Sequence, residues 1–214
     1  FRFRCPVPNS IDVRRIGIAS RLVPRSGGIM DTSGVPFSIL KGSEYFFVVL
    51  TTRPERFARF QVANWVRSSE DQIRNPAGDR NYRVVVPDAS DILSLPETML
   101  DMTSIAVIFW DDLSEDALTP AQRTALADWI RFGGRVIVNG PDASDAFANT
   151  PLGDLLPLTP TSNIELDAEA AIEILEKHSV TSDRSLEKQI QFVRSESSRI
   201  ALDGQLNPGA EAVK

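Results

Sequence analysis

Cysteine and histidine are almost absent from this sequence. Its 214 residues include one cysteine, Cys5, and one histidine, His178. A single cysteine cannot close a disulfide within the chain or build a cysteine-based zinc site, so cysteine usage indicates no compartment. Catalysis by a paired cysteine and histidine would have to rely on these two residues alone.

Clustered basic residues and long apolar runs are also lacking. The net charge is -6, and grouped Lys and Arg drive binding to a nucleic-acid backbone, so we expect no nucleic-acid partner. No apolar run approaches the roughly 18–20 residues that a membrane helix needs, which predicts no membrane segment in this stretch. No glycine loop of the Gly-x-x-x-x-Gly-Lys or Gly-x-Gly-x-x-Gly type follows a strand, which excludes nucleotide binding by those two routes.

The composition is typical of a folded domain. Hydrophobic residues make up 42% and charged residues 24% of the chain, and its length suits one core with appendages. The chain begins at Phe1 rather than at a methionine, and residues 1–4 alternate apolar and basic like a strand separated from its partners. We therefore expect a piece of a larger protein, with any signal peptide or envelope anchor outside this stretch.

Changes of pattern divide the chain into three segments. Residues 1–40 carry many prolines and glycines and predict an irregular lead-in with short strands. Residues 41–165 hold the regular pattern, and residues 166–214 predict a helical extension with a flexible tail from Asp203. Within the lead-in, Leu22–Ser26 resembles a thrombin cleavage sequence with its last two residues altered, and we treat so short a match as coincidence.

Four apolar runs in the middle segment predict strands. Tyr45–Leu50 and Ile105–Trp110 are apolar on both faces, which is typical of buried central strands. Tyr82–Val86 and Arg135–Val138 are shorter runs bounded by turn residues.

Helix signals separate these strands. Thr52 and Glu55 have the spacing of a capping box and predict a helix to about residue 69. Thr119–Gln122 give the clearest start signal in the chain, and Gly133-Gly134 predict a left-handed end to that helix. Because strands alternate with helices, we expect a doubly wound, mostly parallel α/β sheet.

Two further helices are expected in the C-terminal segment. Asp167–His178 carries apolar residues at helical spacing, and Leu186–Val193 gives a second helical stretch. His178 falls at the end of the first of these helices, where a cation interacts favourably with the helix dipole.

The middle segment resembles a known group of domains. The matching residues are those of the apolar strand that ends in Asp111-Asp112, then Leu118–Gln122, Trp129–Gly134, Val136–Asp142 and Thr150–Leu152, with Pro36–Ser43 before the first strand. Together they are similar to the class I glutamine amidotransferase-like, flavodoxin-like domains of large, planctomycete-type bacterial envelope proteins. The resemblance implies this fold and a parent protein associated with the cell envelope.

The sequence departs from the family where the chemistry would take place. A working class I amidotransferase has a nucleophilic cysteine in the turn after the strand that corresponds to Arg135–Val138, with a downstream histidine and glutamate. Here the turn reads Asn139-Gly140-Pro141-Asp142, which offers no thiol, and Cys5 lies in the lead-in. We therefore expect a degenerate elbow, no catalytic residues and no cofactor. The implied role is a non-catalytic structural or interaction module that contacts other domains of the parent chain or another protein.

Acidic residues at the predicted strand ends support an alternative. Asp88 follows the second strand, Asp111 and Asp112 follow the third, and Asp142 follows the fourth. The carboxyl ends of parallel strands share one edge, where ligands bind, and carboxylates are preferred ligands of Mg²⁺ and Ca²⁺. The alternative prediction is a divalent-metal or small-ligand site, with a hydrolytic role, at this edge. Aspartate also suits turns and helix caps, so a purely structural role stays open.

Overall fold

The structure is a computed structural model that describes most of the chain. The described residues are 15–22, 24–28, 31–38, 40, 44–61, 82–88, 93–140, 144, 147, 152–178, 183–195 and 200–211. Internal contacts divide the chain into two compact units, Phe1–Tyr45 with Val62–Arg83 and Phe46–Gln61 with Val84–Lys214. The three segments with boundaries at 40 and 165 stay a prediction.

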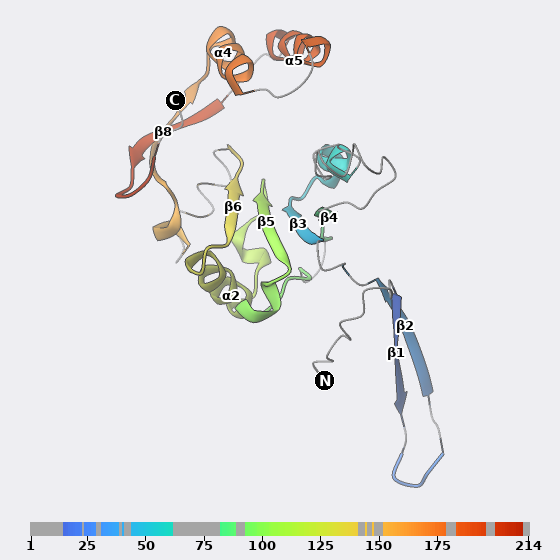
Figure 1. Ribbon diagram of the computed structural model, residues 1–214. Helices are drawn as coiled ribbons and strands as arrows, with labels where there is room; N and C mark the ends of the chain where they lie inside the picture. The colour runs from blue at the N-terminus through green and yellow to red at the C-terminus, as the bar shows by residue number, and fades with distance from the viewer. Residues whose placement is uncertain are drawn as a thin grey trace. The chain divides into compact units, whose positions relative to one another are not determined.

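An antiparallel ribbon of two strands lies in the first unit (Figure 1). Its strands are β1 (Arg15–Leu22) and β2 (Asp31–Ser38), and all eight residues of each are paired without a register shift. In this register Ile16 lies opposite Phe37. The ribbon is more regular than the expected lead-in, because several of the prolines and glycines that suggested irregularity fall in the turn between the strands.

A four-stranded parallel sheet confirms the expected α/β class. Its strands are β3 (Tyr45–Leu50), β4 (Tyr82–Val85), β5 (Ile105–Trp110) and β6 (Arg135–Val138). They lie side by side in the order β4-β3-β5-β6. Each strand falls where the sequence predicts it, within one residue.

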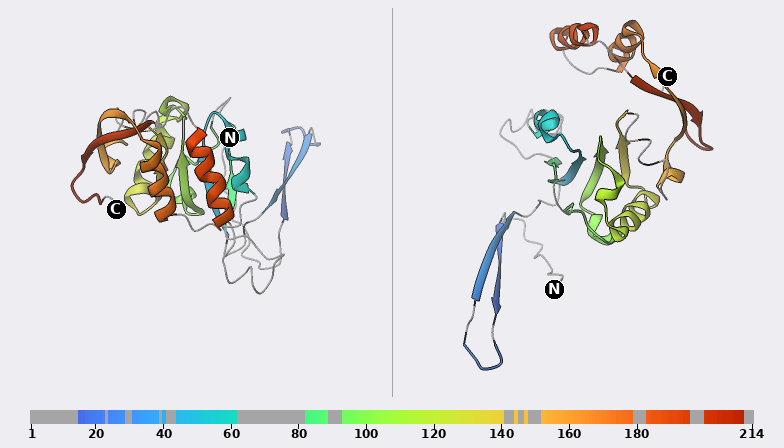
Figure 2. Two further views of the ribbon diagram at one scale, coloured as in Figure 1. Left: turned by 90° about the horizontal axis from the view of Figure 1, so that it is seen from above. Right: turned by 180° about the vertical axis from the view of Figure 1, so that it is seen from behind.

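Helices cover both faces of this sheet (Figures 1 and 2). The chain crosses the sheet in one direction from β3 to β4 and in the other from β4 through β5 to β6. Right-handed crossovers that run in opposite directions lie on opposite faces. Accordingly, η1 (Pro54–Gln61), which follows β3, packs on one face, and α2 (Pro120–Arg131), between β5 and β6, packs on the other.

The larger core lies between the sheet and α2. Trp110 and Ile108 of β5 are fully buried and pack against Leu126 and Trp129 of α2 in one apolar cluster. The indole Nε1 of Trp110 donates to the carbonyl oxygen of Leu113 at 2.8 Å, so this large side chain is buried without an unpaired donor.

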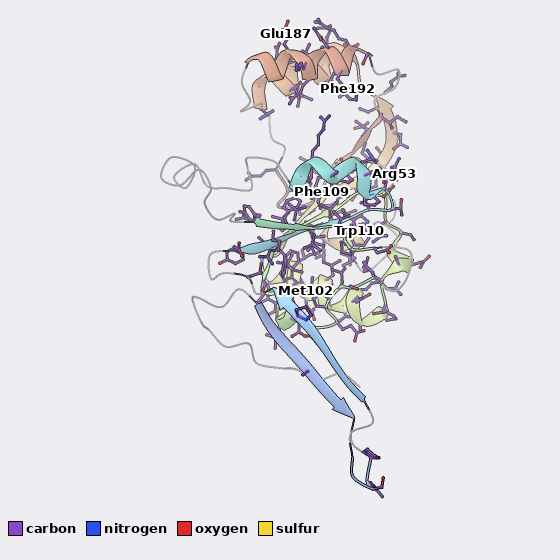
Figure 3. The ribbon with its side chains drawn as sticks, turned by 90° about the vertical axis from the view of Figure 1, so that its right-hand side faces the viewer. Arg53, Met102, Phe109, Trp110, Glu187 and Phe192 are labelled. Atoms are coloured by element: carbon purple, nitrogen blue, oxygen red, sulfur yellow. The ribbon has the colours of Figure 1, made fainter. Side chains whose placement is uncertain are left out.

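An aromatic cluster forms the opposite layer. Phe57 and Phe60 of η1 pack on Phe109 of β5, and their ring centroids lie 5.3 and 5.8 Å from that of Phe109. Phe109 points toward η1 in Figure 3. The sequence predicts an ordinary helix to about residue 69, whereas residues 54–61 form a 3-10 helix and residues 62–69 lie outside the described part.

Helix α2 begins and ends as the sequence predicts. The hydroxyl of Thr119 accepts from the backbone N–H of Gln122, and the side chain of Gln122 accepts from the backbone N–H of Thr119, which completes a capping box. Gly133 ends the helix with φ +97°. A Cβ on Gly134 would collide with the indole ring of Trp129. The second glycine therefore allows the backbone that leads into β6 to pass close to this ring.

The C-terminal region contains two helices and two strands. The helices α4 (Ala168–His178) and α5 (Asp183–Ser195) pack on each other and confirm the predicted pair. Figure 3 labels Glu187 and Phe192 on α5. The strands β7 (Leu158–Glu165) and β8 (Ile200–Leu206) pair antiparallel.

Strand β8 corrects the flexible tail that the sequence predicts from Asp203, at least as far as Leu206. A Cβ at Gly204 would meet the carbonyl of Thr159, so the glycine that suggested flexibility is required for close pairing with β7. Beyond the strand, the side-chain amide of Asn207 donates to the carbonyl oxygen of Leu156 at 2.7 Å.

Three short 3-10 helices complete the described elements: η3 (Met99–Met102), η4 (Glu115–Ala117) and η5 (Gly153–Leu155). Within the described ranges, no helix has both the length and the apolar character required to cross a bilayer.

Candidate functional site

Polar residues follow three neighbouring strands at the carboxyl edge of the sheet. We call them the polar edge: Thr51, Thr52 and Arg53 after β3, Arg56 in η1, Asp111 and Asp112 after β5, and Asn139 after β6. Asp111 and Asn139 continue the strand pairing. The N–H of Asp111 donates to the carbonyl oxygen of Leu50 at 2.9 Å, and the N–H of Asn139 donates to the carbonyl oxygen of Trp110 at 2.8 Å. The side chains are therefore held on rigid backbone.

Asp111 is the buried centre of the polar edge. The residue is only 3% exposed. It accepts hydrogen bonds from the hydroxyl of Thr51 at 3.1 Å, from the guanidinium of Arg56 at 3.0 Å and from the amide of Asn139 at 2.6 Å. A buried carboxylate is tolerated only when it is paired and hydrogen-bonded, and these three donors come from three different elements.

Asp112 binds the segment that follows β3. It accepts from the backbone N–H of Thr52 at 2.7 Å, the hydroxyl of Thr52 at 2.8 Å, the hydroxyl of Thr51 at 2.8 Å and Nε of Arg53 at 2.7 Å. Thr51 has a single hydroxyl proton, so it favours the shorter bond to Asp112 over the 3.1 Å bond to Asp111. Arg53 lies at the start of η1 in Figure 3.

These hydrogen bonds change the acidity of Asp112. Burial by itself would raise the pKa of this carboxyl, but the backbone and hydroxyl of Thr52, the hydroxyl of Thr51 and the guanidinium of Arg53 outweigh it. Together they hold the pKa of Asp112 well below its usual range. The carboxylate is thus charged at every physiological pH.

The two arginines contribute less than their short distances suggest. The side chains of Arg53 and Arg56 are 52% and 45% exposed. Water and salt screen such half-exposed ion pairs, so they contribute little to stability. The polar edge is therefore held mainly by the threonine, amide and backbone donors.

The structure brings together only part of the acidic set expected from the sequence. Asp111 and Asp112 share the edge with Asn139. Asp88 follows β4, is exposed, and is separated from β5 by the intervening strand β3. Pro141 and Asp142 lie outside the described residues.

Sequence reasoning missed the donors of the polar edge. Thr51, Thr52 and Arg53 directly follow β3, so the rule that picked out Asp111 after β5 would also have found them. Thr52 is instead expected to cap a helix. In the structure η1 begins at Pro54, so Arg53 rather than Thr52 precedes the helix and the expected cap is wrong. The hydroxyl of Thr52 instead donates to Asp112.

The same donors bear on metal binding. In the described part of the chain, no three His, Cys, Asp or Glu side chains form a group that could hold a metal ion. The hydrogen atoms directed at Asp111 and Asp112 occupy several of the positions from which a cation would approach their oxygens. A cation that used one of those positions would have to displace the donor there. The metal site stays a prediction.

The turn after β6 is where the resemblance predicts a degenerate nucleophile elbow. Gly140 has φ +84°, a conformation that a residue with a side chain rarely adopts, and the preceding Asn139 donates to Asp111. Ser144 and Phe147 beyond it are helical and buried. His178 is exposed in the last turn of α4, as predicted, and Cys5 lies outside the described residues.

The chain matches no model of a protein family, no curated protein and no solved structure.

Proposed function

We propose that this chain carries a non-catalytic, amidotransferase-like domain of flavodoxin-like topology that acts as a structural or protein-interaction module of a larger protein. Strand order supports the topology: numbered along the chain from β3, the order β4-β3-β5-β6 reads 2-1-3-4, the beginning of the flavodoxin-like order. Ligands of such sheets bind at the carboxyl edge where the strand order reverses, which here lies between β3 and β5.

The observation that carries the proposal is the pairing of Asp111 and Asp112 with donors of the chain itself at this reversal point. Asp111 accepts from Arg56 of η1 and from Asn139 after β6, and Asp112 accepts from residues that follow β3. Groups that would meet a ligand in a binding domain are instead used to join strands. This favours a structural role for the edge.

The turn after β6 supports the absence of catalysis. Where a working amidotransferase presents a thiol, this chain has Asn139 and Gly140, and a neutral amide is neither a nucleophile nor a base. A nucleophile also needs a base within about 3 Å. The one histidine of the sequence, His178, is exposed at the end of α4.

A glutaminase assay tests the proposal. We expect the wild-type chain and the Cys5→Ala variant to release ammonia from glutamine no faster than buffer does. Release that survives Cys5→Ala would reveal a catalytic group other than the thiol. Release that this substitution abolishes would assign catalysis to Cys5. Either result contradicts a non-catalytic domain.

The alternative proposal is a divalent-metal or small-ligand site that uses Asp111, Asp112, Asp142 and Asp88. The observation in its favour is that two adjacent carboxylates, Asp111 and Asp112, follow a central strand at the edge where parallel sheets bind ligands. The two proposals differ in their response to added cations.

A further inference from the structure

The tip of the β1–β2 ribbon presents an exposed peptide bond between Arg25 and Ser26. The N–H of Gly27 donates to the carbonyl oxygen of Pro24 at 3.0 Å, which closes a turn around this bond. Arg25, Ser26, Gly27 and Gly28 are all exposed, and both glycines have positive φ angles.

We propose that the Arg25–Ser26 bond is a cleavage site for a trypsin-type serine protease that accepts arginine in its S1 pocket and proline in its S2 pocket. The reaction is hydrolysis: water adds, the C–N bond breaks, Arg25 gains a carboxylate and Ser26 becomes a new amino terminus. An aspartate at the base of the S1 pocket pairs with the guanidinium of the substrate arginine. Arg25 supplies that group at an exposed loop tip, which is where proteolysis concentrates.

The loop can enter a protease cleft without breaking the ribbon. A protease binds its substrate extended on both sides of the scissile bond. Strand β1 ends at Leu22 and β2 begins at Asp31, and the described residues 24–28 on both sides of the bond lie outside the ladder. Within the described residues 24–28, opening the turn breaks the hydrogen bond between Gly27 and Pro24.

The residues around the bond favour this recognition. Pro24 fixes its own φ near the value of extended backbone, so little order is lost at the S2 pocket. Gly27 and Gly28 can leave their positive φ angles without steric cost. The loop 23–30 contains no acidic residue to oppose binding of arginine.

The site is also unique in the chain. Pro24-Arg25 is the only Pro-Arg pair in the sequence, so a protease that requires this pair has one bond to cut. The match of Leu22–Ser26 to a thrombin sequence can arise by coincidence, yet exposure at a ribbon tip makes the bond a substrate whatever its origin. The cut falls in the ribbon and leaves the four strands of the parallel sheet continuous.

Limited digestion of the full chain with thrombin tests the proposal, with intact-mass spectrometry as the readout. We expect two products, residues 1–25 and 26–214. The Arg25→Gln variant should stay intact. The matched control Arg21→Gln, which changes an arginine in the paired strand β1, should be cut at the wild-type rate.

A synthetic peptide of residues 20–31 shows whether the sequence is cleavable without the ribbon. If thrombin cuts this peptide but leaves the folded chain intact, the tip is not accessible and the proposal is overturned. It is overturned equally if the peptide resists cleavage, or if the first cut in the folded chain falls at another bond.

Discussion

Asp111 and Asp112 are neighbours in the sequence but stabilise different parts of the fold. Asp111 accepts from η1 and from the turn after β6, and it shares the hydroxyl of Thr51 with Asp112. Within the described part of the chain, the donors to Asp112 come from residues 51–53, which fixes the turn that leads from β3 into η1. One carboxylate thus joins elements across the sheet, and the other shapes a single connection.

The Asp112→Asn substitution should remove stability in a pH-dependent way. The folded-state pKa of Asp112 lies below the ordinary value of about 3.9, so its charge stabilises the fold fully above that pH. The contribution is lost as the pH falls below about 4 toward the folded-state pKa. In urea unfolding between roughly pH 7 and pH 3, we expect the free-energy difference between wild type and variant to be largest near neutrality and to shrink on acidification.

Asp154→Asn serves as the matched control. Asp154 is exposed and accepts no side-chain hydrogen bond within the described ranges, so its substitution should change the free energy of unfolding little at any pH. An Asp112→Asn difference that stays constant with pH, or that grows on acidification, would contradict the hydrogen bonding of Asp112.

The sequence predicts the acceptors of the polar edge better than its donors. Asp111 and Asp112 stand out because they end an apolar run abruptly. Arg56 could not be found in this way, since it lies within η1 and reaches Asp111 only because η1 packs beside β5. A residue that depends on the packing of another element leaves no local signal.

At the scale of the element, Gln122 does more than cap α2. It is 3% exposed, and its amide donates to the carbonyl oxygens of Leu93 and Leu95 at 2.7 and 3.0 Å. The first turn of α2 is thereby attached to the segment before η3. The capping-box spacing predicts the cap but gives no sign of this second attachment.

Two substitutions separate these roles. Thr119→Ala removes the cap alone and should lower the free energy of unfolding by about 1 kcal/mol. Gln122→Ala removes the two buried bonds to the carbonyl oxygens of Leu93 and Leu95, and the N–H of Leu95 still donates to Leu93. The loss of these two bonds should cost about 1–3 kcal/mol, more than the loss of the cap. Urea unfolding measures both, and Thr119→Ser should retain most of the wild-type stability. A Gln122→Ala variant no less stable than Thr119→Ala would contradict the attachment to Leu93.

Local signals predicted the strands of the parallel sheet and the helices α2, α4 and α5. They failed for the pairing of β7 with β8, because the strands are separated by two helices and interrupted by Pro160 and Gly204. They also failed for η1, where the capping-box spacing of Thr52 and Glu55 suggested an ordinary helix. Contacts between distant segments, rather than local propensity, decide these elements.

At the scale of the whole molecule, the fold places carboxylates where a parallel sheet binds ligands and then occupies them with its own donors. The edge between β3 and β5 is the expected ligand position, and Asp111 lies there with 3% exposure. The polar edge thus connects strands at the position where parallel sheets bind ligands.

The melting temperature of the full chain in increasing Mg²⁺ or Ca²⁺ tests this claim most directly. A cation that binds the folded state at about 100 times its Kd adds about 2.7 kcal/mol of stability, which is readily detected as a rise in the melting temperature. We predict no rise with either cation, for wild type or for the Asp111→Asn variant. A rise that saturates with cation concentration in the wild type and is absent from Asp111→Asn would contradict the claim and establish a metal site at this edge.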